Sequence, residues 1–254
     1  MLSQIAPHLP TSFGRYYEPF LGGGALFFLL QPTRALLSDA NADLINIWQH
    51  VATQPHAVYA AATEIAFDKE TYYEVRRRTT RDPVQRAGEF LYLNRGAFNG
   101  LYRVNRSGEF NVPWGSPRTD VIVELETLNA ASKALMSTGV TVAQLDFAEA
   151  LGRARAGDLV YLDPPYVTGH NSNGFIDYNE KLFSWTDQVR LAQSAERARK
   201  RGVHVLISNA LNASIRALYP NFAEQELSRH SSIAGKSDHR GKATEALYVG
   251  SKNG

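Results

Sequence analysis

The chain has 254 residues, 44% hydrophobic and 20% charged, which is ordinary for a globular protein and sufficient for one large domain or a domain with an insertion. It contains no cysteine, which excludes disulfides and thiolate metal sites, and no apolar run approaches the roughly 18 residues of a membrane span. The net charge of +2 does not by itself indicate a nucleic-acid partner, although basic residues cluster in Arg76–Arg86, Arg95–Arg106, Arg197–Arg201 and Arg229–Lys242.

The first part of the chain predicts short strands alternating with helices. Residues 15–28 have the pattern of a strand, a glycine turn and a helix start, and Arg34–Leu37 is an apolar segment typical of a second strand. A helix is expected over Ser38–Trp48, because Ser-Asp-Ala-Asn is a typical helix start. Apolar spacing then predicts a mainly helical stretch over Ala57–Ala97.

The middle of the chain is less regular. Asn94–Gly115 interrupts the helical pattern with glycines, asparagines and a Pro-Trp pair, and Arg106–Glu109 reads as the turn of a β-hairpin. Val121–Ser137 is helical in pattern again. Residues 48–139 are therefore expected to form a mainly helical insertion that carries a hairpin.

The last part returns to α/β alternation. Strands are predicted at Val140–Leu145, Leu159–Leu162, Val203–Ser208 and Ala246–Gly250, and helices at Phe147–Ala154, Asp187–Arg201 and Ala213–Tyr219. This alternation predicts an α/β fold with a mostly parallel sheet flanked by helices. The sheet domain is expected to comprise residues 1–47 and 140–254.

The glycine turn suggests a ligand site. Gly22, Gly23 and Gly24 follow one another, so backbone can pass close to a ligand, but the spacing is not that of a dinucleotide fingerprint. Glu18 beside the turn suits a cationic group, and Asp39 about 20 residues later suits a ribose diol. S-adenosylmethionine has both groups and no phosphate. The alternatives are a glycine helix entry without a ligand and a helix N-cap role for Asp39.

The tetrapeptide Asp163-Pro164-Pro165-Tyr166 follows a buried strand, at the edge where open α/β sheets bind ligands. The Asp163 carboxylate and the Pro164 carbonyl supply two acceptors, the prolines stiffen the turn, and Tyr166 offers an aromatic face. This set suits an exocyclic amino group on a planar heterocycle. The alternative is a rigid exit from the strand.

Four segments together resemble Dam-type DNA adenine-N6 methyltransferases with the motif order of the alpha class. These are Glu18–Gly24, Ser38–Asp43, Asp163–Tyr166 and Leu93–Gly115, the last of which is very specific, and the resemblance extends from about Ile5 to Tyr248. It implies a Rossmann-like methyltransferase domain with an inserted target-recognition domain at 48–139. It also implies double-stranded DNA as partner, a cytoplasmic location, no metal, and a restriction endonuclease as a further partner to consider.

The resemblance implies roles for particular residues. The methionine end of S-adenosylmethionine is expected at Glu18 and the glycine loop, its ribose at Asp39 and its adenine at Asp146-Phe147, although Phe147 alone would suit a core position. The full cofactor set is Glu18, Pro19, Phe20, Gly22, Gly24, Asp39, Asp146, Phe147 and Asp163. Asp163, Pro164, Pro165 and Tyr166 are the expected catalytic residues, and the leading aspartate resembles the adenine-directed form of the motif.

The recognition segment is expected to bind DNA through Arg95, Phe98, Asn99, Leu101, Arg103, Asn105 and Pro113. Arginine reads guanine through paired hydrogen bonds, and Phe98 matches an aromatic residue that enters the base stack near a flipped base. Phe98 taken alone would suit a core position. Further phosphate contacts are expected from Arg106, Lys236, Arg240 and Lys242, with an ordinary surface role as the alternative. Family members of this type methylate adenine in GATC.

The chain departs from the family pattern at its start. Members usually carry a lysine, an aromatic residue and a Gly-Gly-Lys element ahead of the residues that match Met1–Pro10, and this element is absent. We expect that the first residue given lies downstream of the true start of the protein. The chain as given is then expected to bind S-adenosylmethionine weakly. Two alternatives stay open: a catalytically impaired DNA-binding relative, and an RNA or glutamine methyltransferase.

Overall fold

The computed structural model describes residues 1–105, 109–166, 183–230 and 242–251. The chain divides into two compact units: Met1–Ala40 with Thr138–Gly254, called here the sheet unit, and Asn41–Ser137, the helical unit. The boundary expected at residue 47 would run through helix α3 (Ala42–Thr53). The whole of α3 belongs to the helical unit because it packs against other helices of that unit.

The sheet unit contains a seven-stranded sheet in the order β3-β2-β1-β4-β5-β7-β6. Its strands are β1 (Tyr16–Glu18), β2 (Ala35–Asp39), β3 (Val140–Gln144), β4 (Leu159–Leu162), β5 (His204–Ala210), β6 (Ala223–His230) and β7 (Lys242–Gly250). Strands β1 to β5 run parallel to one another, while β7 runs antiparallel to β5 and to β6. The predicted α/β fold with a mostly parallel sheet is confirmed.

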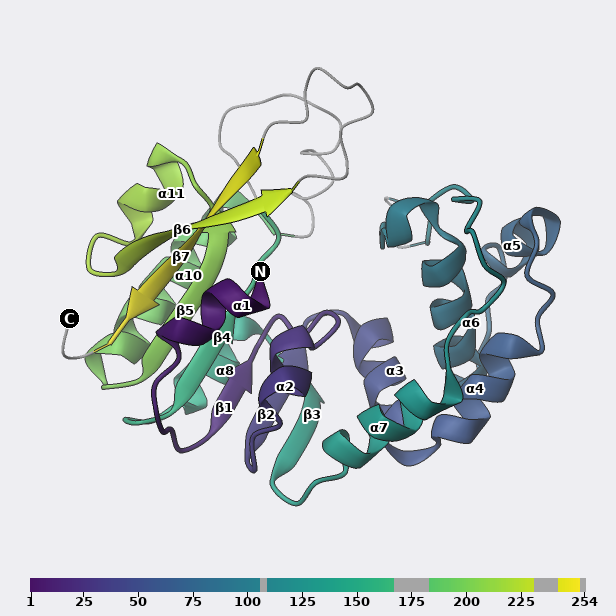
Figure 1. Cartoon of the computed structure of the whole chain (residues 1–254), viewed down its shortest axis with the longest axis horizontal. Helices are drawn as coiled ribbons and strands as arrows, with labels where there is room; N and C mark the ends of the chain where they lie inside the picture. The colour runs from purple at the N-terminus through teal and green to yellow at the C-terminus, as the bar shows by residue number, and fades with distance from the viewer. Residues whose placement is uncertain (106–108, 167–182, 231–241, 252–254) are drawn as a thin grey trace. The chain divides into compact units, whose positions relative to one another are not determined.

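Helices cover both faces of this sheet. They are α1 (Leu2–Ile5), the 3-10 helix η1 (Ala6–His8), α2 (Ala25–Leu30), α8 (Phe147–Arg153), α10 (Trp185–Lys200) and α11 (Ala213–Leu218). Figure 1 shows α1 and α2 on the near face of the sheet and α8 on the far face. Helix α10 begins two residues before the predicted Asp187, because Ser184 and Asp187 form a capping box in which each side chain accepts from the other's backbone N–H.

The strand order reverses next to β1, which lies between β2 and β4. Tyr16 pairs with Leu159 and Tyr17 with Val160, so the carboxyl ends of β1 and β4 lie side by side. All four residues of β4 are buried, which explains its continuous apolar run. Such a reversal is where open α/β sheets form a ligand crevice, and Glu18 and Asp163 both lie there.

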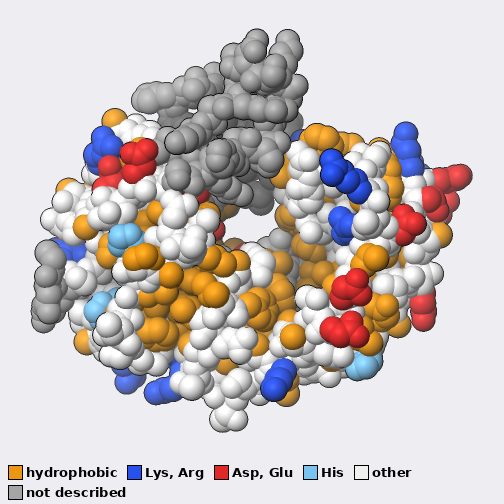
Figure 2. All heavy atoms as spheres, viewed as in Figure 1, with side chains coloured by type: hydrophobic (Ala, Val, Ile, Leu, Met, Phe, Trp, Pro, Cys, Tyr) orange, Lys and Arg blue, Asp and Glu red, His pale blue; other side chains and the backbone are white. Residues whose placement is uncertain are grey.

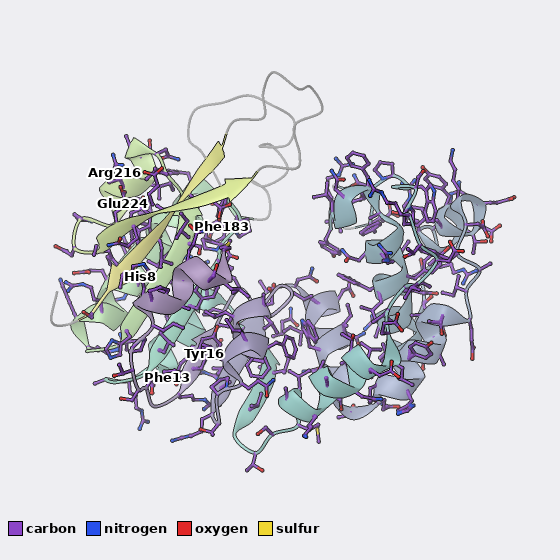
Figure 3. All side chains as sticks on the ribbon, viewed as in Figure 1. His8, Phe13, Tyr16, Phe183, Arg216 and Glu224 are labelled. Carbon is purple, nitrogen blue, oxygen red and sulfur yellow. The ribbon has the colours of Figure 1, made fainter. Side chains whose placement is uncertain are left out.

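The sequence does not predict strand β6, and β7 begins four residues earlier than expected. The sequence of β6, Ala-Glu-Gln-Glu-Leu-Ser-Arg-His, is mostly polar because β6 is an edge strand of the described sheet, where it pairs with β7. Arg216 of α11 donates two hydrogen bonds of 2.9 Å to the carboxylate of Glu224, and Figure 3 shows the two residues beside each other. Cross-strand and helix contacts thus fix a strand that lacks an apolar pattern of its own.

The helical unit contains α3, α4 (Pro55–Thr63), α5 (Lys69–Val75), α6 (Pro83–Gly96), the 3-10 helix η2 (Phe98–Gly100) and α7 (Leu125–Leu135). Its aromatic core is formed by Tyr72, Tyr92 and Trp114. The centroid of the Tyr72 ring lies 6.4 Å from that of Tyr92 and 5.3 Å from that of Trp114. The predicted hairpin is present as an antiparallel bridge between Val104 and Phe110. Its turn residues 106–108 lie outside the described residues.

Candidate active site and DNA-binding segment

Glu18 ends strand β1 as a buried carboxyl group, with only 3% of its surface exposed. The hydroxyl of Tyr16 donates a hydrogen bond of 2.8 Å to Oε2 of Glu18. Burial is the main reason that the pKa of Glu18 is raised to about 8; the Tyr16 hydrogen bond opposes this shift, and the nearby charge of Asp163 adds to it. Glu18 is therefore a carboxyl group that a cationic partner would ionise.

The glycine turn after β1 has the conformation that its sequence predicts. Gly22 and Gly24 have φ of 47° and 64°, and a Cβ on Gly24 would lie 3.1 Å from the ring of Phe28. A Cβ on Gly23, in contrast, would meet no protein atom within 4 Å. The backbone N–H of Gly22 donates to Oδ2 of Asp39 at 3.4 Å, which ties the turn to the end of β2. The turn is thus a cradle that leaves space at Gly23.

Asp39 ends strand β2 and does not cap a helix. The N-cap of α3 is Asn41, whose side chain accepts from the backbone N–H groups of Asp43 and Leu44 at 2.9 and 3.2 Å. The helix-cap alternative for Asp39 is therefore wrong, as is the expected helix start at Ser38. Asp39 is opposite Gln144 in the β2–β3 register, so the ends of these two strands lie at the same edge as Glu18.

Asp163 to Tyr166 follow β4 at this edge. The charge of Asp163 raises the pKa values of Glu18, Tyr161 and Tyr166, which places its carboxylate in the same electrostatic environment as these groups. Burial is the main cause of the raised pKa of Tyr166, and the nearby charges of Asp163 and of Glu245 on β7 raise it further. Titratable groups from β1, from the end of β4 and from β7 are thus brought together.

A buried pair of amide side chains holds the proline turn. Gln188 of α10 and Asn209 of β5 are both completely buried. Nε2 of Gln188 donates to the carbonyl oxygen of Pro165 at 3.4 Å, and Nδ2 of Asn209 donates to Oε1 of Gln188 at 3.3 Å. Gln188 thus supplies a hydrogen-bond donor to a turn whose prolines have no N–H group, and Asn209 orients Gln188.

Asp146 and Phe147 lie at the start of α8. Asp146 is the N-cap, with Oδ1 accepting from the backbone N–H of Ala148 at 2.8 Å, and hydrogen bonds from Arg190 lower its pKa. The ring of Phe147 is 5% exposed and stacks on the ring of Phe20 with centroids 5.5 Å apart. Pro19, between β1 and Phe20, is buried. The two aromatic residues expected near the cofactor therefore do lie against each other.

The predicted DNA-binding residues all lie in the helical unit. Phe98 is 50% exposed, so the core alternative for this residue is wrong. Asn99 has φ of 55° within η2, Leu101 is half-buried and Pro113 is exposed. Three polar side chains in this set make hydrogen bonds within the helical unit: Arg95 to Val121 and Thr119, Arg103 to Asn111 at 2.7 Å, and Asn105 to Glu109 at 2.7 Å.

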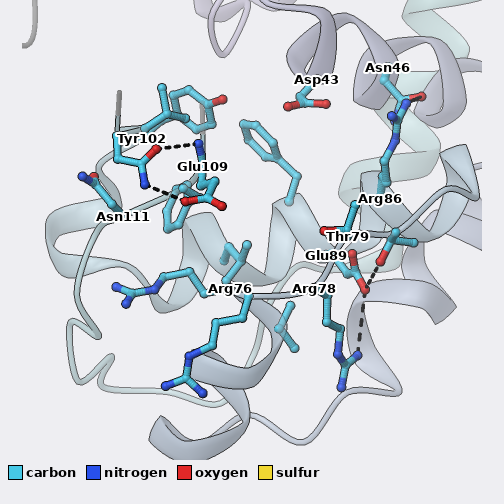
Figure 4. Close-up of a pocket in the computed structure, with 18 residues that line it drawn as sticks. Asp43, Asn46, Arg76, Arg78, Thr79, Arg86, Glu89, Tyr102, Glu109 and Asn111 are labelled. Atoms are coloured by element: carbon cyan, nitrogen blue, oxygen red, sulfur yellow. Dashed lines mark hydrogen bonds and ion pairs between the residues drawn. The ribbon is translucent and has the colours of Figure 1, made fainter. Parts of the chain in front are cut away.

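Charge on the helical unit is mixed. Figure 2 shows basic and acidic side chains interspersed on the visible face of this unit. A cavity of about 520 Å³ lies between the hairpin and the residues after α5, and Figure 4 shows the residues that line it. Four arginines, Arg76, Arg77, Arg78 and Arg86, line it together with Asp43, Glu89 and Glu109, and Asn105 is the one predicted DNA-binding residue in its lining. Expected phosphate contacts at Arg106, Lys236 and Arg240 lie outside the described residues.

Metal-ligand clusters and membrane-spanning helices are both absent from the described residues. These residues contain no group of three histidine, aspartate or glutamate side chains that could hold a metal ion. Within the same part of the chain, no helix is both long enough and apolar enough to cross a membrane.

Sequence reasoning missed five residues of this site. They are Tyr16, Gln188, Arg190, Asn209 and Glu245, which contact Glu18, the proline turn, Asp146 or Tyr166. Tyr16 could have been found, because it lies two residues before Glu18 on one strand and side chains at that spacing share a face. The other four come from strands and a helix distant in sequence, and no local pattern connects them to the motifs.

The chain is similar to known adenine methyltransferases over nearly its full length. The family described as D12 class N6 adenine-specific DNA methyltransferase matches residues 1–233. Type II methyltransferase M1.LlaDCHI of Lactococcus lactis subsp. cremoris is 34% identical over 97% of this chain and 91% of its own length. The DNA adenine methylase of Vibrio cholerae is 34% identical over 98% of this chain and 91% of its own length. The DNA N-6-adenine-methyltransferase of Escherichia phage P1 is 36% identical over 98% of this chain and 34% of its own length.

These matches confirm the resemblance drawn from the motifs and agree with the observed sheet. The chain therefore belongs to the D12 class of N6 adenine-specific DNA methyltransferases.

Proposed function

We propose that this methyltransferase transfers a methyl group from S-adenosylmethionine to N6 of an adenine that has been flipped out of double-stranded DNA, in the sequence GATC. The family membership supplies the reaction class, and the residues at the sheet edge supply groups of the required chemistry. S-adenosylmethionine, when bound, supplies an electrophilic methyl group on a sulfonium centre. The remaining steps belong to side chains and backbone of the chain itself.

The residues of the sheet unit suit such a cofactor. Glu18 is a buried carboxyl group with a raised pKa, which an ammonium group would stabilise in its ionised form. The glycine turn leaves open space at Gly23, and Asp39 has carboxylate oxygens suited to ribose hydroxyls. The start of α8 offers Phe147 for stacking and Asp146 as an acceptor for the adenine amino group. Pro19, Phe20, Gly22 and Gly24 would shape the surroundings of the methionine end.

The catalytic role falls to Asp163 and the carbonyl of Pro164. The adenine amino nitrogen is a weak nucleophile because its lone pair is delocalised into the ring. Two acceptors that hydrogen-bond to its two N–H groups would favour a pyramidal nitrogen with a directed lone pair. Their stabilising effect grows as positive charge develops on the nitrogen in the transition state. Pro165 and Tyr166 complete the site: Pro165 stiffens the turn, and the Tyr166 ring would stack on the flipped base.

DNA recognition is assigned to the helical unit. Phe98 is an exposed aromatic side chain, which suits insertion into the base stack where the adenine leaves it. Arg103 retains donors beyond those that bind Asn111, and a guanidinium group reads guanine with about 1–3 kcal/mol of discrimination. Asn99, Leu101, Asn105 and Pro113 would contact bases or sugars beside it, and Arg95 a phosphate. The family resemblance supplies the assignment to GATC.

One observation carries the proposal: the carboxyl groups of Glu18, in the glycine-loop motif, and Asp163, in the Asp-Pro-Pro-Tyr motif, interact electrostatically where the strand order reverses. A cofactor held by one would meet a base held by the other. The resemblance also allows a cognate restriction endonuclease as a partner and implies action on cellular DNA.

The test uses tritium-labelled S-adenosylmethionine and three duplexes: one with GATC, one with the site scrambled, and one carrying N6-methyladenine at both adenines of the site. Label is expected in the first duplex alone. Equal label in the first two would contradict the sequence specificity, and equal label in the first and third would contradict adenine N6 as the target. No transfer to any duplex, with cofactor binding absent as well, would favour the catalytically impaired relative.

A further inference from the structure

Arg190 of helix α10 binds the two residues assigned to the cofactor adenine. Its two terminal nitrogens donate to Oδ1 and Oδ2 of Asp146 at 2.8 and 2.9 Å, and one of them also donates to Asp187 at 3.1 Å. The guanidinium carbon lies 4.1 Å from the centroid of the Phe147 ring, which is a close cation–π contact. One side chain therefore engages both Asp146 and Phe147.

The ring of Phe147 has little surface left for another partner. Phe20 stacks on it at an interplanar angle of 24°, Phe183 approaches at 61° with centroids 5.8 Å apart, and the whole residue is 5% exposed. A purine could stack on Phe147 only after Arg190 or Phe20 moved. Arg190 is the easier to move, because 43% of its side chain is exposed whereas Phe20 packs against the hydrophobic core.

Both carboxylate oxygens of Asp146 already accept hydrogen bonds. Oδ1 accepts from the backbone N–H of Ala148 and from Arg190, and Oδ2 accepts from Arg190. The adenine amino group would therefore have to share or replace a position that the guanidinium now holds. Hydrogen bonds between the two partners lower the pKa of Asp146 and raise that of Arg190, so both stay charged throughout the neutral range.

We propose that Arg190 competes with the adenine of the cofactor for the face of Phe147 and the carboxylate of Asp146, and thereby sets the affinity of the site for adenosine ligands. This inference rests on the proposed function, which assigns Asp146 and Phe147 to the adenine. Arg190 itself takes no part in methyl transfer. It is displaced toward solvent when adenosine binds, and the cost of breaking its contacts is subtracted from the binding free energy.

The test is calorimetric titration of the full chain with S-adenosylhomocysteine and with 5′-methylthioadenosine, which contains only the adenosine half. Arg190→Ala is expected to bind both ligands about three- to tenfold more tightly than the unsubstituted protein, the size expected for a partly exposed ion pair and a cation–π contact. Arg190→Lys keeps the charge but cannot lie flat on the ring or bind both oxygens, so its affinity should fall between the two.

The matched control is Arg153→Ala, which removes another half-exposed arginine from the same region, where it pairs with Glu149 at 2.6 Å. Its affinity for both ligands should be unchanged. Equal or weaker binding by both folded Arg190 variants, beside normal binding by the unsubstituted protein, would overturn the competition alone. No binding of either ligand to any of the four proteins would instead overturn the cofactor assignment, and the competition with it.

Discussion

The hydroxyl of Tyr16 donates a 2.8 Å hydrogen bond to Oε2 of Glu18, and the two buried residues are the first and the last of strand β1. The hydrogen bond favours the ionised carboxylate, yet the pKa of Glu18 is raised to about 8 because the loss of hydration outweighs it. The same burial, with the charge of Glu18, raises the pKa of Tyr16 well above its usual value. The Glu18 carboxyl group therefore keeps its proton at neutral pH, which affects both the stability of the fold and the binding of a cation.

The stability of the protein should fall as pH rises from about 5 to 8. In this range the unfolded chain has ionised Glu18, whereas the folded protein keeps its proton until the pH passes about 8. The folded state then binds more protons, so the free energy of unfolding decreases by up to ~1.4 kcal/mol per pH unit from this one group. Urea denaturation of the unsubstituted protein and of Glu18→Gln at several pH values measures this. Parallel pH profiles of the two proteins would rule out the raised pKa.

Cofactor binding should release a proton near pH 7 if an ammonium group pairs with Glu18. Ionising this carboxyl group is part of the binding reaction, because the group is protonated beforehand. Titration calorimetry in two buffers of different ionisation enthalpy gives the number of protons released, and Glu18→Gln should release fewer. An identical proton count in the two proteins would contradict the contact.

Gly23 and Gly24 should respond differently to alanine. Gly24→Ala places a side chain at φ of 64° and 3.1 Å from Phe28, which costs about 1–3 kcal/mol of folding stability. Gly23→Ala meets no protein atom within 4 Å, so its thermal unfolding should be unchanged. If a cofactor lies along the turn, the same methyl group should weaken S-adenosylhomocysteine binding at least tenfold, about 1.4 kcal/mol. Unchanged affinity of Gly23→Ala would place the ligand elsewhere.

Phe98→Ala should impair base flipping and leave folding intact. The side chain is 50% exposed, so its removal should change the free energy of unfolding by less than about 0.5 kcal/mol. The fluorescence of 2-aminopurine at the target adenine, which rises when the base leaves the stack, should fall in the Phe98→Ala complex. Val121→Ala is the control, because Val121 is 48% exposed in the same unit. Equal fluorescence in the two complexes would argue against insertion of Phe98.

Local sequence patterns predicted the parts of the fold that depend on local chemistry. The buried run Leu159–Leu162, the glycines at positive φ and the aspartate at the start of α8 each show their role within a few residues. The polar edge strand β6 does not, because its place depends on pairing with β7. The contacts of Arg190 and Gln188 were also beyond prediction, since they join residues more than twenty positions apart. The motif resemblance predicts which residues are catalytic, but it does not predict the residues from other elements that contact them.

The most direct measurement is single-turnover methyl transfer to a GATC duplex by the unsubstituted protein, Asp163→Asn and Asp163→Ala, with the product identified as N6-methyladenine by mass spectrometry. Loss of the acceptor that stabilises charge in the transition state should slow transfer by about 10²–10³-fold in both variants, while calorimetry still detects S-adenosylhomocysteine binding. Transfer by Asp163→Ala at the unsubstituted rate would contradict the assignment of catalysis to this carboxylate.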